Sequence, residues 1–382
     1  MSLTGWVFLD LIVACTVASF VALILLWPSL AGRSLGKIAA RAGIFLTVNA
    51  LILLTAATQL NAQYLFYADW TDLRGAFTGI PTVTPLSRGA TASHATRGKV
   101  VGTAAAAARR LPPLPIGRMS ASGVISYRVK GPLSGLTGAV FVQLPGGYIT
   151  PSNAAVRYPV IETFSGIPGD PRIWIGKMNL GGVVAQEAAA KRIRPVLIVS
   201  PQMEFPAGVD TECVNGSAGN PQVETWLTRD VPNWVADTFR VQTDRTSWAA
   251  AGLSAGGWCA AMATMLHPAQ YAAAIVMGGY FRPEFSAFYY PYPPRSQLAA
   301  RYDLVALTMR NPPPVAFWLE TSHMEGSAYN SSAAFLTAAK PPLAVDATVL
   351  QHAGHRDTVW QGLLPSSLIW LGANVLGFKA TP

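Results

Sequence analysis

Charged residues are scarce in this sequence. Asp, Glu, Lys and Arg make up only 12% of its 382 residues, whereas hydrophobic residues make up 51%. In an ordinary soluble domain about a quarter of the residues are charged. The shortage of charge therefore argues against a wholly soluble protein and favours one that lies partly in lipid.

Cysteine is also scarce, since the chain has three. Cys15 lies in an apolar segment and is expected to act as a small hydrophobic residue. The sequence has no C-x-x-C pair and no cluster of His and Cys, so we expect no metal and no other cofactor. Cys213 and Cys259 can form a disulfide if this part of the chain lies outside the cytoplasm. Two unpaired buried thiols are the alternative.

The formal net charge is +9, but the basic residues are scattered and form no stripe interleaved with aromatic residues. We therefore expect no nucleic-acid partner. The basic residues between positions 74 and 118 fit anionic lipid or a cell-envelope polymer better. An ordinary solvated tether is the simplest interpretation of them.

Two long apolar segments, 6–28 and 42–60, lie near the N-terminus. Each is long enough to cross a hydrocarbon core of about 30 Å as a helix. A secretory signal peptide would begin with basic residues, and Met1–Gly5 has none. Residues 1–62 therefore predict a membrane anchor of two transmembrane helices in contact with lipid.

The connection between these segments carries Arg33, Lys37 and Arg41, whereas no Lys or Arg precedes the first segment. Cytoplasmic loops of membrane proteins are enriched in such residues. We therefore expect the connection in the cytoplasm and both ends of the chain outside it.

The rest of the chain divides by composition. Residues 75–118 are rich in Gly, Ala, Thr, Ser and Pro, and we expect a low-complexity extracytoplasmic linker over 63–118. Residues 119–382 alternate short apolar runs with stretches long enough for helices, which predicts an α/β-hydrolase fold with a mainly parallel central sheet covered on both faces. The expected strands are 124–129 and 139–144, as an antiparallel pair, followed by 159–164, 195–200, 248–253, 273–277, 315–319 and 347–351.

The segment Gly252–Gly257 reads Gly-Leu-Ser-Ala-Gly-Gly and contains a G-x-S-x-G motif. A strand-like run precedes it and an Ala-rich, helix-like run follows it. Such a strand-to-helix turn exposes the serine hydroxyl over the edge of the sheet, and its glycines avoid collisions. Ser254 is therefore the candidate nucleophile, and an ordinary tight turn is the alternative.

A serine needs a base and an acid to become nucleophilic. His355 follows the last strand-like run, in agreement with the chain order serine, acid, histidine. His352 is the second choice and is expected to pack or hydrogen-bond at the end of the strand. Of the other histidines, His94 lies in the linker, His267 ends the helix after the nucleophile and is expected to be structural, and His323 lies in the loop that should carry the acid.

Two glutamates follow the run 315–319. Glu325 lies far enough into the loop to reach back to the imidazole, whereas Glu320 comes so early that it can still belong to the strand. We prefer Glu325 and keep Glu320 as the alternative acid. The oxyanion hole should use the N–H of Ala255, directly after the nucleophile, and that of Ile167, because Pro168 has no N–H to donate.

Four segments occur in a characteristic order: 140–148, 165–169, 252–257, and Gly354-His355 followed by Trp360. In this order they resemble the putative-esterase branch of the α/β-hydrolases, which includes S-formylglutathione hydrolase, feruloyl esterases and secreted mycolyltransferases. The resemblance implies a triad of Ser254, His355 and Glu325. Many members have an aspartate in place of the glutamate, and relatives often have His or Asp in place of Ser165. A membrane-tethered member would suit an actinobacterial envelope.

These features predict a membrane-anchored extracytoplasmic serine esterase that hydrolyses an ester of an acyl lipid or a small molecule through an acyl-enzyme. The first alternative is an acyltransferase, similar to the mycolyltransferases, that moves the acyl chain to a sugar or lipid hydroxyl with the same residues. The second alternative is a non-catalytic scaffold that binds the cell envelope. The Ser254 and His355 pair argues against it.

Overall fold

The computed structural model describes residues 2–78, 86–89, 123–286 and 289–380. The chain forms two compact units. The first unit contains the N-terminal residues up to Thr84 and two short loops, His323–Glu325 and Gln351–Arg356. The second unit contains the sheet and the helices that cover it.

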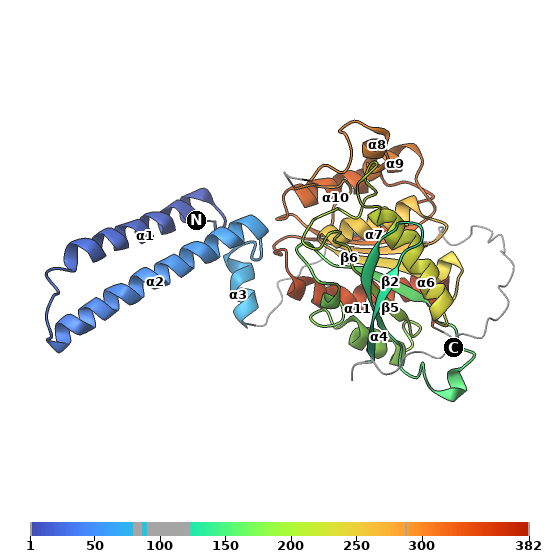
Figure 1. Ribbon diagram of the computed structural model, residues 1–382, viewed down its shortest axis with the longest axis horizontal. Helices are drawn as coiled ribbons and strands as arrows, with labels where there is room; N and C mark the ends of the chain where they lie inside the picture. The colour runs from blue at the N-terminus through green and yellow to red at the C-terminus, as the bar shows by residue number, and fades with distance from the viewer. Residues whose placement is uncertain (1, 79–85, 90–122, 287–288, 381–382) are drawn as a thin grey trace. The chain divides into compact units, whose positions relative to one another are not determined.

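In the first unit, α1 (Trp6–Leu26) and α2 (Leu35–Tyr64) run side by side in opposite directions (Figure 1). Both are long and apolar enough to cross a membrane. A hydrogen bond of 2.8 Å joins the hydroxyls of Thr16 and Thr55 across the pair. Side-chain hydrogen bonds of this kind help to hold apolar helices together where the hydrophobic effect between them is weak.

The second of these helices is longer than the predicted segment 42–60. It begins at Leu35 because Ser34 caps it by accepting a hydrogen bond from the N–H of Lys37. The additional first turns carry Lys37 and Arg41, which are good helix formers but costly in hydrocarbon. The pattern of hydrophobicity therefore identified the apolar part of the helix and not its whole length.

Two elements form inside the predicted linker, 63–118. The helix α3 (Trp70–Thr78) begins where the N–H of Asp72 donates to Oδ1 of Asp69, 2.8 Å away. The strand β1 (Leu86–Gly89) pairs antiparallel with β9. Residues 79–85 and 90–118 lie outside the described residues. The linker as a whole stays a prediction, and its first residues, 63–74, are richer in aromatic side chains than the low-complexity stretch that follows.

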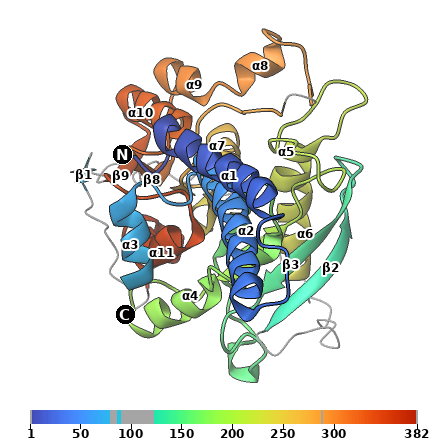
Figure 2. The same cartoon turned by 90° about the vertical axis from the view of Figure 1, so that its left-hand side faces the viewer.

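The second unit is built on a nine-stranded sheet with the order β1-β9-β8-β7-β6-β4-β5-β3-β2. Adjacent strands are parallel along the run β5-β4-β6-β7-β8-β9. The strand β3 pairs antiparallel with β5, β2 with β3, and β1 with β9. The two edges are visible in Figure 2. The remaining strands are β2 (Val124–Lys130), β3 (Thr137–Gln143), β4 (Val160–Phe164), β5 (Leu197–Pro201), β6 (Trp248–Leu253), β7 (Ala273–Met277), β8 (Ala316–Ser322) and β9 (Ala344–Leu350). This architecture confirms the predicted fold class.

The strand order determines on which face of the sheet the connecting helices lie. The units β4-α4-β5 and β6-α7-β7 step in opposite directions along the sheet, so right-handed crossovers put α4 and α7 on opposite faces. The helix α11 packs against α4. The helices of this unit are α4 (Leu180–Ala189), α5 (Val223–Thr225), α6 (Val231–Thr238), α7 (Ala255–Leu266), α8 (Gln297–Arg301), α9 (Leu304–Arg310), α10 (Ser327–Ala338) and α11 (Asp357–Asn374).

The strand order reverses between β4 and β6. In open α/β sheets, ligands bind outside the carboxyl ends of the strands at such a reversal. A disulfide joins Cys213 to Cys259 and connects the loop before α5 to α7. It closes a loop of 46 residues and thereby stabilises the helix that follows the candidate nucleophile.

Candidate active site

Ser254 lies between the last residue of β6 and the first residue of α7. Its backbone has φ 56° and ψ −128°, a combination that residues other than glycine rarely adopt and that tends to occur at functional sites. The N–H of Ser254 donates to the carbonyl of Met277 at 2.8 Å, which helps to hold the turn. The geometry is that of a nucleophile elbow.

Steric crowding explains why glycine occupies two positions of the motif. A Cβ on Gly252 would lie 1.8 Å from the carbonyl oxygen of Gly256, and a Cβ on Gly256 would lie 2.2 Å from that of Phe164. Neither position has room for a side chain, because the turn folds tightly on itself and against the end of β4. The G-x-S-x-G pattern therefore reflects the packing of the elbow.

The two predicted oxyanion donors come from segments that meet at the elbow. Ala255 is the first residue of α7, so its N–H has no acceptor within the helix. Ile167 lies in the loop after β4, next to a Gly166 whose Cβ position is 3.2 Å from the Cβ of Ser254. The close approach of this loop to Ser254 fits a role in binding the oxyanion.

A groove of about 270 Å³ lies beside this loop. Ser165 and Gly169 line it, together with polar side chains such as Glu204 and the apolar side chain of Met203. A lining that mixes polar and apolar groups is typical of small-molecule sites.

His355 and Glu325 form a hydrogen-bonded pair. The Nδ1 atom of His355 lies 2.8 Å from Oε1 of Glu325, and the side chain of Glu325 is 2% exposed. Glu325 lies shortly after β8 and His355 shortly after β9, on two short loops of the first unit. A carboxylate at Nδ1 orients the ring so that Nε2 can accept a proton from a serine.

The alternative acid has a different partner. Glu320 lies within β8, is 1% exposed, and its Oε2 accepts a hydrogen bond of 3.0 Å from the N–H of Gly278. It thus stabilises the backbone after β7. Ser254 belongs to the second unit, whereas His355 and Glu325 belong to the first, so the joint action of the three residues is part of the proposal below.

His352 and His267 have structural contacts. His352 pairs with Asp69 at 2.9 Å and its side chain is 59% exposed, whereas His267 lies 2.6 Å from Oε1 of Glu224. His323 lies in the first unit, in the same turn as Glu325, and His94 lies outside the described residues. Within the described part of the chain, no group of three or more His, Cys, Asp or Glu side chains is placed to hold a metal ion.

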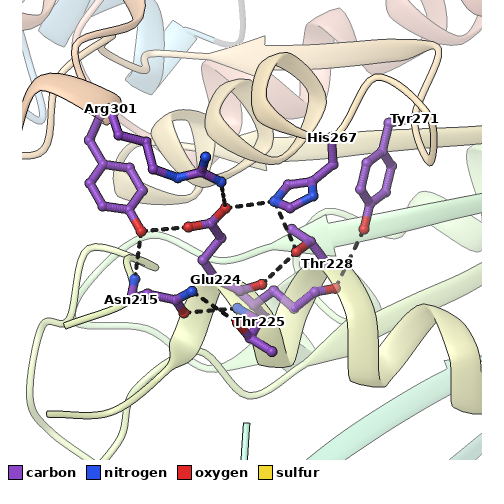
Figure 3. A network of polar contacts seen from close by, with 9 residues as sticks. Asn215, Glu224, Thr225, Thr228, His267, Tyr271 and Arg301 are labelled. Atoms are coloured by element: carbon purple, nitrogen blue, oxygen red, sulfur yellow. Dashed lines mark hydrogen bonds and ion pairs between the residues drawn. The ribbon is translucent and has the colours of Figure 1, made fainter. Parts of the chain in front are cut away.

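The contacts of His267 belong to a buried polar network around Glu224 (Figure 3). His267, Arg301 and Tyr302 all contact the carboxylate of Glu224. Burial opposes ionisation, but these hydrogen bonds outweigh it and lower the pKa of Glu224 to about 2. Glu224 is therefore charged at neutral pH, and the network connects α5 to the end of α7 and to α8.

A second buried carboxyl behaves in the opposite way. Glu162 lies in β4 and is 0% exposed. Its Oε2 accepts a hydrogen bond of 2.6 Å from the hydroxyl of Tyr271, while its Oε1 has no hydrogen-bond partner among the residues that the structure describes. Burial raises the pKa of Glu162 from 4.5 to about 8, although the bond from Tyr271 favours the charged form. Glu162 is therefore protonated at neutral pH.

This shift predicts a pH-dependent stability. Between about pH 4.5 and pH 8 the unfolded chain releases the proton of Glu162 and the folded chain keeps it, so the free energy of unfolding falls by up to about 1.4 kcal/mol per pH unit. Glu162→Gln removes this contribution, and its amide oxygen can still accept from Tyr271. We expect denaturant unfolding to show that the free energy of unfolding of the variant, relative to that of the wild type, is higher at pH 8 than at pH 5. Equal pH dependence of the two proteins would contradict the assignment.

Comparisons with known proteins agree with this geometry. The sequence model of the family described as "Putative esterase" matches residues 137–370. An uncharacterized protein of Corynebacterium glutamicum is 31% identical over 140 residues, which cover 36% of this chain and 32% of that protein. The match therefore spans about a third of the relative's length.

Three solved structures share the fold. A ferulic acid esterase is 19% identical with a TM-score of 0.54, covering 65% of this chain and 96% of that chain. An S-formylglutathione hydrolase from Agrobacterium tumefaciens is 15% identical with a TM-score of 0.56, covering 67% and 98%. The fluorophosphonate-binding serine hydrolase F of Staphylococcus aureus is 13% identical with a TM-score of 0.52, covering 65% and 97%.

Proposed function

The chain belongs to the Putative esterase family, and from this we propose that it is a membrane-anchored serine esterase whose catalytic domain, residues 119–382, lies outside the cytoplasm. The family and the fold make it a hydrolase of the esterase type. The finer proposal concerns the residues that carry the reaction, the side of the membrane on which it occurs, and the substrate.

In the proposed mechanism the hydroxyl of Ser254 attacks the carbonyl carbon of an ester while His355 takes its proton. Glu325 holds the imidazole through Nδ1 and stabilises the imidazolium that forms. The N–H groups of Ala255 and Ile167 bind the oxygen of the tetrahedral intermediate. His355 then gives its proton to the departing alcohol, and water, deprotonated by His355, releases the acid from the acyl-enzyme.

The observation that carries this proposal is the strained backbone of Ser254 in a glycine-lined turn between β6 and α7. A costly conformation persists where the surrounding structure enforces it, and it is common where catalysis uses it. The hydrogen bond between Glu325 and His355 supports the assignment of the acid and the base.

Anchoring in a membrane is supported by the two apolar helices. The basic residues near their connection, Arg33, Lys37 and Arg41, favour a cytoplasmic position for it. The disulfide between Cys213 and Cys259 is typical of proteins in oxidising compartments. These observations favour an extracytoplasmic catalytic domain and an ester of an acyl lipid or a small molecule as the substrate.

Product analysis tests the reaction. The full chain, purified in detergent, is incubated with p-nitrophenyl butyrate, alone and with a large excess of glycerol or trehalose. We expect butyrate as the main product in every case, because water resolves the acyl-enzyme. A butyryl ester of the added polyol as the main product would show that the enzyme is an acyltransferase rather than a hydrolase. Absence of nitrophenol release from the folded wild type would contradict catalysis and favour a scaffold.

A further inference from the structure

The end of the membrane hairpin contacts the loop that carries His355. We call residues 65–72 the juxtamembrane turn and residues 351–356 the histidine loop. Both belong to the first unit of the structure. The turn follows directly on α2, which ends at Tyr64, so these contacts connect a candidate membrane-spanning helix to the candidate base.

Asp72 is central to these contacts. Its carboxylate is buried, with 3% of the residue exposed. The Oδ2 atom accepts hydrogen bonds from the N–H of Gly354 at 3.0 Å and from Nη1 of Arg356 at 2.6 Å. The Oδ1 atom accepts from Nη2 of Arg356 at 2.6 Å. Asp72 therefore holds the residues on both sides of His355, one of them through a bidentate ion pair, the strongest class of side-chain hydrogen bonding.

The backbone of the turn also contacts the histidine loop. The carbonyl of Leu65 accepts a hydrogen bond of 2.7 Å from the N–H of His355 itself. A Cβ on Gly354 would lie 2.2 Å from the carbonyl oxygen of Phe66. The glycine before the histidine is therefore required by the close approach of the juxtamembrane turn.

The turn is well suited to hold a position. The side chain of Asn61, in the last turn of α2, accepts from the N–H of Tyr67 at 2.7 Å and donates to its carbonyl at 3.0 Å. The Oδ2 atom of Asp72 also accepts from the N–H of Ala68 at 3.0 Å. The turn is thus closed by its own hydrogen bonds and presents fixed acceptors to the histidine loop.

We propose that Asp72 is a positioning residue for His355 and that the juxtamembrane turn is part of the catalytic apparatus rather than the start of a passive tether. The proposal rests on the role of His355 as the base in the proposed function. A catalytic imidazole must be held to within a fraction of an ångström, and its loop is positioned by hydrogen bonds to its backbone and neighbours. Asp72 makes these bonds from outside the family domain, residues 137–370.

The first experiment compares Asp72→Asn with Asp303→Asn in the full chain. Asp303 pairs with Arg282 at 2.9 Å, and an asparagine there also loses an ion pair with an arginine. We expect Asp72→Asn to lower kcat about 10- to 100-fold with little change in KM, because a displaced base slows the chemical step. The kcat of the control variant, Asp303→Asn, should stay within about twofold of the wild-type value. The burst of nitrophenol counts active molecules, so that unfolded protein does not enter kcat.

The outcomes separate the two hypotheses. An inactive wild type contradicts the proposed function. An active wild type together with an Asp72→Asn variant of unchanged kcat overturns the positioning role alone. A variant whose rate per total protein falls only in proportion to its unfolded fraction, with KM and kcat per active molecule unchanged, also overturns it, because a merely structural residue behaves in this way.

The second experiment does not depend on how well a variant folds. A protease site is inserted between residues 79 and 85, before β1, and the purified full chain is cut there in detergent. We expect the fragment that carries α1 to α3 to remain bound to the catalytic fragment and kcat to be retained. Dissociation of the fragments with full retention of kcat would overturn the proposal.

Discussion

Ser254→Ala is expected to reduce kcat for ester hydrolysis by about a million-fold, because the nucleophile and the acyl-enzyme are lost together. The folded state should hardly change. Alanine keeps the Cβ that the backbone at φ 56° already accommodates, and the N–H that bonds to Met277 remains. A fluorophosphonate probe, which phosphonylates an activated serine, should label the wild type stoichiometrically and leave the variant unlabelled.

Ser366→Ala is the matched control for this experiment. Ser366 is exposed on α11, and its hydroxyl donates only to the carbonyl of Leu363 in its own helix. The fluorophosphonate probe should label this variant to the same extent as the wild type. Labelling that persists in Ser254→Ala and disappears in another serine variant would show that the elbow is not the nucleophile.

The same reagent reports the side of the membrane. A charged probe that does not cross membranes should label the wild type in intact cells, if the catalytic domain lies outside the cytoplasm. Labelling only after lysis would contradict the extracytoplasmic orientation, while the assignment of Ser254 as the nucleophile would stand.

Glu325→Gln is expected to lower kcat by roughly 10³- to 10⁴-fold, whereas Glu320→Gln should leave it within about tenfold of the wild type. The amide of glutamine can present its NH₂ group to Nδ1 and favour the wrong tautomer of His355, and it cannot stabilise the imidazolium. Glu320 accepts from the backbone of Gly278, and an amide oxygen can do the same. The two substitutions make the same chemical change in neighbouring buried glutamates, so each serves as the control for the other.

The measurement is kcat on p-nitrophenyl butyrate, with thermal unfolding recorded for both variants. We expect Glu320→Gln to affect mainly the melting temperature. A large loss of kcat in Glu320→Gln together with a small loss in Glu325→Gln would reverse the assignment of the acid.

Much of the fold could be predicted because local patterns and tertiary environment agree. The strands β6 and β7 lie where short apolar runs predicted them, since strands buried on both faces read as continuous apolar sequence. The strand β8 extends further than the run 315–319. Its pairing with β9 continues to Ser322, opposite Leu350, and includes Glu320, which follows the apolar run closely enough to be expected in the strand.

The juxtamembrane contacts could not be predicted in the same way. Asp72 and Arg356 are separated by 284 positions in the chain, and nothing in the local pattern of either residue indicates the other. Asp72 lay within the bounds of the predicted linker, 63–118, because a boundary set from local residue types has no information on distant partners.

The sequence by itself indicated the tight turn around Ser254, the chain order of the candidate nucleophile and the candidate base, and the two apolar helices. Each depends on residues close together in the chain: glycines where a turn leaves no room for Cβ, and runs of apolar residues long enough for a strand or a membrane. The tertiary structure alone showed that Glu325 bonds to His355, that Cys213 and Cys259 are joined, and that Asp72 bonds to the histidine loop. These are pairings between segments far apart in the chain, and each forms only when folding brings its two segments together.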